Sequence, residues 1–375
     1  MEMEERKREK EVVPLDIVMN ILKRVPVKSL MRFKCVSKEW LNLPTNPYFI
    51  KQQLQHSTRN AALLLQRIHR QPPPISFSVC LVGPHNNLIH QSHLSHIALL
   101  DVKILDSCNG LLCLRNNTAL SILNPATHQI RPVPTPTVMP FHDVGFGFSS
   151  LTDDYKIVRI SMCVIFKQPK VDRAEVYSLT SGSWREINAV KLHNLGLVSR
   201  SVAITGTIFW LASRTFSSTH YEFVVSFDIG RELFTLMIGP QMPSSPSHTF
   251  NNYELVVCND ELAMFCNCIV RNFVSCSFDL WVLKDFNCDY DDDRRDGGGE
   301  SWVKMYSVGP FSGLVYPLSL WKDEIVCRER LKVENGGDSV IGLFNPVSKI
   351  LKQLQPDRDE FCYVPFTYIE SLIPV

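Results

Sequence analysis

The 375-residue sequence predicts a small all-α N-terminal module followed by an all-β propeller of about six blades, with five or seven as alternatives. Three observations predict this fold. Apolar residues at helical spacing are concentrated within residues 14–41. Short apolar or alternating runs, separated by turn residues, fill the rest of the chain, which is typical of all-β folds. A hairpin pattern also recurs there, at a period close to the roughly 50 residues of one class of propeller blade.

Composition indicates an ordinary globular chain, with 45% hydrophobic and 21% charged residues. Lys and Arg number 39 against 38 Asp and Glu, so a generic nucleic-acid binder is not expected. Residues 1–11 are a charged tail without the apolar core of a secretory signal, and no apolar run suits a membrane span. The 12 cysteines are therefore expected to be reduced core thiols, and the protein to reside in the cytosol, the nucleus or both.

Residues 14–41 are expected to form three short helices. Pro14 suits the first turn of a helix, where its missing N–H is not needed. Pro26 ends this helix, because the residue before a proline avoids the helical region. Shorter apolar stripes follow over residues 27–33 and 35–41. The first helix carries the stripe Ile17, Val18, Ile21, Leu22 and Val25.

So small a module buries little surface alone and usually needs a metal, disulfides or a partner. No set of metal ligands lies within it, so it either docks on a partner or forms a helical cap on the following domain. Periodicity by itself favours neither alternative.

The string of residues 14–40 resembles the F-box, a short three-helix motif. Val13 and Val25 replace leucines of the family pattern, which are conservative changes in an apolar contact. The resemblance implies docking on the small Skp adaptor of a cullin-RING ubiquitin ligase. The matching pieces are Pro14, Ile21-Leu22, Val25-Pro26, Val27-Lys28-Ser29-Leu30, Arg32-Phe33, Cys35-Val36-Ser37-Lys38 and Trp40.

This resemblance also implies which residues contact the adaptor or form the core of the module. The basic residues between them are expected to favour an acidic adaptor surface. The implied residues are Pro14, Ile17, Ile21, Leu22, Val25, Pro26, Leu30, Phe33, Val36 and Trp40.

The hairpin repeat consists of an apolar strand, a turn and a second strand that begins with an apolar or aromatic residue. Its markers lie 54, 50, 55 and 62 residues apart, so residues 60–375 hold about six blades. Tight turns at 205–206, 259–260 and 322–323 lie between the hairpins, as the inner strands of a blade require. A pair of β-sandwiches is the alternative. The markers are Asn124, Ser178, Asp228, Leu283 and Asn345.

Residues from about 100 to 330 resemble the F-box-associated, kelch-like domain of a large plant F-box family. Family members use this domain to capture the protein to be ubiquitinated. The expected organisation is a tail over 1–11, an F-box over 12–56, a linker with the first propeller strands over 57–100, and the propeller over 101–375. The strings that carry the resemblance include Asp106–Cys113, Asn124–Thr127, Gly145–Phe148, Asp153–Val158, Val176–Leu179, Ser183-Trp184, Gly206–Leu211 and Phe227-Asp228.

Other candidate sites are expected to be structural. His85, His90, His93 and His96 suit a solvated loop better than a metal site, and residues 289–299 suit a flexible excursion better than a calcium loop. No catalytic residue, metal or cofactor is assigned. Cys266, Cys268 and Cys276 are expected to be buried. Aromatic side chains are expected to pack between blades, namely Trp184, Trp210, Trp281, Trp302 and Trp321.

The sequence thus predicts a non-catalytic substrate-recognition subunit whose partners are a Skp adaptor, through it cullin and RING subunits, and an unidentified target protein. Neither nucleic acid nor membrane is expected as a partner. One alternative is a propeller hydrolase, with convergent carboxylates or a Ser-His pair of perturbed pKa at the propeller mouth. Another is a carbohydrate-binding or protein-binding scaffold with a non-functional F-box.

Overall fold

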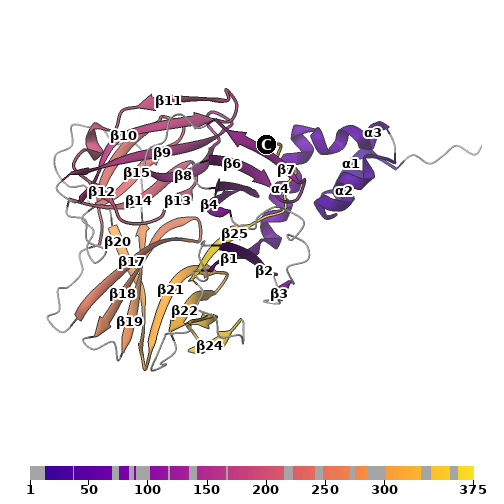
Figure 1. The fold of residues 1–375 in the computed structure, drawn as a ribbon. Coiled ribbons are helices and arrows are strands. Elements are labelled where there is room, and N and C mark those ends of the chain that lie inside the picture. Colours follow the sequence, from indigo (N-terminus) through magenta and orange to yellow (C-terminus); the bar gives the residue numbers. More distant parts are fainter. Residues whose placement is uncertain are drawn as a thin grey trace, which may run out of the picture.

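The computed structural model describes residues 13–36, 38–69, 76–83, 88–89, 102–116, 119–134, 142–165, 168–214, 223–240, 248–270, 275–284, 301–330, 339–354 and 362–375. These residues form a helical module beside a six-bladed β-propeller (Figure 1). Among them, no helix has the length and apolar character that a membrane crossing requires.

The three predicted helices are present as α1 (Leu15–Leu22), α2 (Val27–Phe33) and α3 (Lys38–Asn42). Pro14 and Pro26 directly precede α1 and α2. Helix α1 ends at Leu22, so Val25 belongs to the turn before Pro26 and not to the helix. The reason is the steric restriction that a proline places on the residue before it.

A fourth helix, α4 (Pro47–Ser57), extends the module beyond the three predicted helices. It follows a 3₁₀ turn, η1 (Leu43–Thr45), and leads into a second, η2 (Thr58–Asn60). The side chain of Asn46 accepts hydrogen bonds from the backbone N–H groups of Tyr48 (2.9 Å) and Phe49 (3.2 Å) and so caps the helix. The apolar pattern of α4 is sparse, but Asn-Pro at 46–47 is a readable start signal.

The propeller consists of six antiparallel sheets. The bounds of the first three blades, in spatial order, are β25 (Cys362–Tyr368), β1 (Ala62–His69), β2 (Ser76–Val82) and β3 (Leu88–Ile89); β4 (Lys103–Cys108), β5 (Leu111–Asn116), β6 (Ala119–Asn124) and β7 (Gln129–Val133); β8 (His142–Ser149), β9 (Asp154–Ile165), β10 (Gln168–Ser178) and β11 (Ser183–Ile187).

The 3₁₀ turn η4 (Val190–Leu192) follows blade 3. The bounds of the remaining blades are β12 (Gly196–Leu197), β13 (Val202–Ile204), β14 (Thr207–Ser213), β15 (Phe223–Asp228) and β16 (Leu233–Ile238); β17 (His248–Cys258), β18 (Glu261–Val270), β19 (Cys276–Lys284) and β20 (Ser301–Phe311); β21 (Leu314–Trp321), β22 (Glu324–Arg330), β23 (Ser339–Asn345) and β24 (Ile350–Gln353).

Blade 1 closes the ring, because the last strand of the chain completes a sheet begun directly after the helices. Strand β25 lies beside β1 (Figure 1) and pairs with it antiparallel. Leu64 is opposite Phe366 in this pairing. The inner strands contact one another consecutively in a closed circle: β4, β8, β13, β17, β21 and β25. The propeller prediction is therefore confirmed with six blades, and the pair of β-sandwiches is wrong.

The sequence repeat has a physical cause in the turn before each outer strand. Asn124, Asp228 and Asn345 each accept, through Oδ1, the backbone N–H of the residue two positions later, at 2.8–3.0 Å. The fifth marker, Leu283, lies inside β19, and the turn after that strand is outside the described residues. Four positions after Asn124, Ser178, Asp228 and Asn345, the backbone adopts a positive φ, at His128, Gly182, Glu232 and Lys349 respectively.

Buried apolar layers lie between neighbouring blades all around the ring. Trp210 is fully buried between blades 3 and 4, and Trp321 is buried between blades 6 and 1. Trp184, Trp281 and Trp302 are half-buried against two further layers. The prediction that aromatic side chains pack between blades is confirmed.

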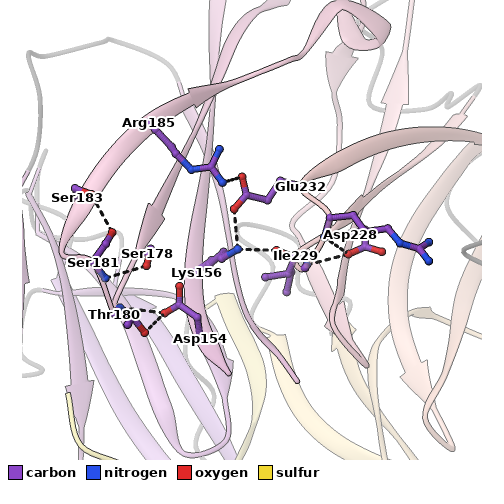
Figure 2. Close-up of polar contacts among 12 residues, drawn as sticks. Asp154, Lys156, Ser178, Thr180, Ser181, Ser183, Arg185, Asp228, Ile229 and Glu232 are labelled. Carbon is purple, nitrogen blue, oxygen red and sulfur yellow. Dashed lines mark hydrogen bonds and ion pairs between the residues drawn. The ribbon is translucent and has the colours of Figure 1, made fainter. Parts of the chain in front are cut away.

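A polar contact joins blades 3 and 4 at their tight turns (Figure 2). The buried Lys156 Nζ donates to the Ile229 carbonyl (3.0 Å) and pairs with Glu232 Oε1 (2.7 Å). The other carboxylate oxygen of Glu232 pairs with Arg185, which is largely exposed. Burial lowers the pKa of Lys156. Lys156 belongs to a string that carries the family resemblance, and its position gives it a structural role.

Glu232→Gln is expected to lower the free energy of unfolding by about 3 kcal/mol, because it removes the carboxylate paired with the buried Lys156 and leaves that charge only the longer-range attraction of Asp154 and Asp228. Arg185→Ala removes the other partner of the same carboxylate, in solvent, and is expected to cost less than about 1 kcal/mol. Urea unfolding of the full chain measures both. Equal losses of unfolding free energy in the two variants would contradict the conclusion that the pair of Glu232 with Lys156 stabilises the fold more than its pair with Arg185.

Candidate functional site

Helix α1 has one face toward solvent and one toward the module core. Ile17 is 51% exposed and Ile21 is 58% exposed. Residues four positions apart share a helix face, so these two side chains form a continuous apolar row. Leu22, on the other face, is only 4% exposed. The helix is therefore apolar on both faces, although only one face packs against the chain.

Other large apolar side chains of the helical module are also more exposed than buried. Val36 is 64% exposed, and Val13 and Leu41 are about as exposed as Ile17. Exposed basic residues accompany them: Arg24, Lys28 and Arg32. Single exposed apolar residues are ordinary, but several on so small a module indicate a protein-binding surface.

The ten residues implied by the F-box resemblance fall into two sets. Phe33 and Trp40 are half-buried and pack against each other in a tilted arrangement, with ring centroids 5.5 Å apart and an interplanar angle of 56°. Leu22 and Leu30 are buried, and Val25 is half-buried beside them. The exposed set, which remains free to contact a partner, consists of Pro14, Ile17, Ile21, Pro26 and Val36.

The core of the module also contains two residues that the sequence analysis missed. Phe49 of α4 is fully buried, and Leu372, from the far end of the chain, packs into the same cluster as Leu22 and Leu30. The helix start signal Asn-Pro at 46–47 could have indicated the helix that carries Phe49, whereas no local signal marks Leu372. The module thus packs on its own propeller and still leaves the row of Ile17 and Ile21 uncovered, so the two alternatives, cap and docking module, are not exclusive.

Among the carboxylates of the propeller that the structure describes, Asp106 of the inner strand β4 has the pKa that burial raises furthest. One oxygen accepts the Ser107 N–H (2.8 Å), and the other accepts the Phe146 N–H (3.4 Å) and the Ser201 hydroxyl (3.1 Å). Burial raises its pKa to about 7. These donors belong to three successive blades, so Asp106 ties blades 2, 3 and 4 together.

Asp143, on the neighbouring inner strand β8, also has a pKa raised by burial, to about 6. Raised carboxylate pKa values are what the hydrolase alternative predicts. The hydrogen bonds of Asp106 nevertheless go to groups of the chain itself, which gives this residue a structural explanation. Within the described part of the chain, no group of three or more His, Cys, Asp or Glu residues is arranged to hold a metal ion.

Asp106 is expected to make stability depend on pH. Its pKa is about 7 in the folded chain and near 3.8 when unfolded. As pH rises from about 4 to 7, the unfolded state ionises first, so the folded state loses relative stability, by at most about 4 kcal/mol. Asp106→Asn removes this titration. Urea unfolding of both proteins should show the wild type losing stability relative to the variant over that range and a constant difference above pH 8; a constant difference throughout would contradict the assignment.

The cysteines singled out in the sequence have structural positions. Cys266 is buried and Cys268 half-buried, and burial raises the pKa of both thiols. The Cys276 thiol donates to the Gly313 carbonyl (3.1 Å) and accepts the Val315 N–H (3.1 Å), so it joins blades 5 and 6. His85, His90, His93 and His96 and the acidic stretch 289–299 lie outside the described part of the chain, so what the sequence predicts of them stays a prediction.

Comparison with known proteins agrees with both halves of this architecture. The F-box domain family matches residues 13–52, and the F-box associated beta propeller domain family matches residues 75–375. F-box protein CPR1 of Arabidopsis thaliana is 25% identical over 323 residues, which cover 79% of this chain and 73% of that protein. An F-box/kelch-repeat protein of the same plant is 27% identical over 342 residues, covering 84% and 85%.

The resemblance inferred from the sequence is thereby confirmed. The second family covers most of the chain, and the structure contains the propeller that its description names. The chain therefore belongs to the F-box proteins that carry an F-box associated beta propeller domain.

Proposed function

We propose that this protein is the substrate-recognition subunit of a Skp-cullin-F-box ubiquitin ligase. The helical module binds a Skp-type adaptor, which links it to the cullin and RING subunits, and the propeller captures a target protein. The observation that carries the proposal is the uncovered apolar row of Ile17 and Ile21 on an F-box helix. The protein works in the cytosol, the nucleus or both.

In this role the chain performs no bond chemistry itself. It holds a target near a ubiquitin-loaded enzyme, which raises the effective concentration of the reacting groups. The row on α1 supplies apolar area for the adaptor interface. The exposed Arg24, Lys28 and Arg32 favour an adaptor whose facing surface is acidic, which speeds association and selects against basic partners.

Co-expression of the full chain with a Skp-type adaptor, followed by gel filtration, tests the proposal. We expect a stable complex of one chain with one adaptor. A folded chain that elutes without the adaptor would refute the adaptor role and favour a scaffold with a non-functional F-box. Leu22 is unsuitable for a disruptive variant, because it is buried and its replacement tests folding instead of docking.

A further inference from the structure

Residues 369–375, here called the C-terminal segment, run between the helical module and blade 2 after strand β25 (Figure 1). Ser371 is fully buried, and Leu372 and Ile373 are nearly so. Buried side chains on a segment without helix or strand structure need a reason, since such segments usually lie on the surface. The contacts of this segment supply one.

Toward the helices, the segment contributes both hydrogen bonds and apolar contact. Glu370 Oε2 accepts the Val27 N–H at the start of α2 (3.2 Å), and the Glu370 carbonyl accepts from Gln53 Nε2 of α4 (3.2 Å). The Leu372 side chain enters the core of the helical module. Residues 370 and 372 therefore engage the module.

Toward the propeller, the contacts come from Ser371 and Ile373, which alternate with the residues that contact the helices. Asn124 Nδ2 donates to the carbonyls of Ser371 (3.0 Å) and Ile373 (2.8 Å), and Ile373 enters the layer between blades 2 and 3. Gly110 has a φ of +85°, and a Cβ there would lie 2.3 Å from the Ile369 carbonyl oxygen. Only glycine leaves the segment room to pass at this point.

Asn124 both makes the turn at the end of its strand and anchors the C-terminal segment. Its Oδ1 makes the turn at the end of β6, as Asn345 does in blade 6 and Asp228 does in blade 4. The turn is thus compatible with either asparagine or aspartate. Only the amide group of asparagine, however, can also donate to the two carbonyls of the C-terminal segment.

We infer that the C-terminal segment, anchored by Asn124, holds the F-box module in one orientation on the propeller. Leu372 and Glu370 are its positioning residues on the helical side. This inference rests on the proposed function for its consequence: the adaptor-binding row and the target-capturing propeller then move as one body, which defines where a captured target stands relative to the ligase.

Asn124→Asp separates the two tasks, because it keeps the oxygen that makes the turn and removes the donor. Asn345→Asp is the matched control: it makes the same change at the equivalent turn of blade 6, where the Asn345 Oδ1 accepts the backbone N–H groups of Val347 and Ser348 within the turn itself. The measurement is hydrogen–deuterium exchange of the full chain without adaptor, together with small-angle X-ray scattering.

We expect Asn124→Asp to speed amide exchange at least tenfold in residues 14–57 and 369–375, with blade 5 unchanged, and to broaden the distribution of interatomic distances in scattering. Asn345→Asp should leave both regions and the scattering as in the wild type. If the segment exchanges faster while residues 14–57 and the scattering stay unchanged, the segment does not hold the module and the inference is overturned.

Leu372→Ala covers the case in which Asn124→Asp also loosens blade 5. It removes only a side chain that faces the helices, so exchange should rise in residues 14–57 with the propeller unchanged; wild-type exchange there would overturn the inference. Because no adaptor is present in these measurements, they are independent of the proposed function. Failure of the adaptor to co-elute would count against that function alone.

Discussion

Ile21→Asp is expected to weaken binding of a Skp-type adaptor by at least about 100-fold while the chain stays folded. Ile21 is 58% exposed in the structure, so a charge there is solvated in the free chain and costs little stability. In the proposed complex the same position would be buried against apolar surface, where an unpaired carboxylate is strongly unfavourable. The variant should therefore change affinity and not folding.

Titration calorimetry with purified adaptor measures this affinity, and far-ultraviolet circular dichroism checks the fold. Ile350→Asp is the matched control, because Ile350 is similarly exposed but lies on the outer strand β24. It should bind the adaptor as the wild type does. Wild-type affinity in Ile21→Asp would show that the row on α1 is not the docking surface.

Trp210→Ala is expected to cost about 4 kcal/mol of unfolding free energy. The Trp210 ring is fully buried in the layer between blades 3 and 4. It lies directly over Gly145 of blade 3, where a Cβ would come within 2.6 Å of Trp210 Cζ2. Gly145 cannot move into the space that the ring leaves, because its strand β8 is held by pairing with β9. The backbone of β14 is likewise held by pairing with β15, so the cavity remains.

Urea unfolding of the full chain, monitored by circular dichroism, measures the loss. Leu233→Ala is the control in the same blade, because Leu233 is largely exposed and its truncation should cost less than about 1 kcal/mol. Similar losses in the two variants would indicate that the interface between blades 3 and 4 contributes little to stability.

Much of this protein could be predicted from local signals. The apolar stripe of residues 17–25 and the flanking prolines indicated the first helix, although proline geometry ended it at Leu22. The strand repeat was readable because blades 2, 3, 4 and 6 use the same turn chemistry, an Asn, Asp or Ser followed four residues later by a positive φ. The position of α4 was missed, because its apolar pattern is sparse.

The candidate site was only half predictable. The sequence pointed to ten residues of the F-box but did not separate Ile21, which faces solvent, from Leu22, which faces the core. Both are apolar neighbours on one short helix, and which side of that helix is covered depends on what packs against it. That packing comes from α4 and Leu372, outside the stretch that carries the motif.

The sequence by itself determined the succession of a helical module and a propeller, the F-box string and the approximate blade number, because each depends on residues within one turn or one hairpin. Only the tertiary structure decided how the ring closes, which F-box side chains stay exposed and what holds the helices to the propeller. Val27 and Glu370 are 343 positions apart, and Asn124 and Ser371 are 247 apart. No local pattern encodes such pairs, since they meet only after the strands between them have closed the propeller.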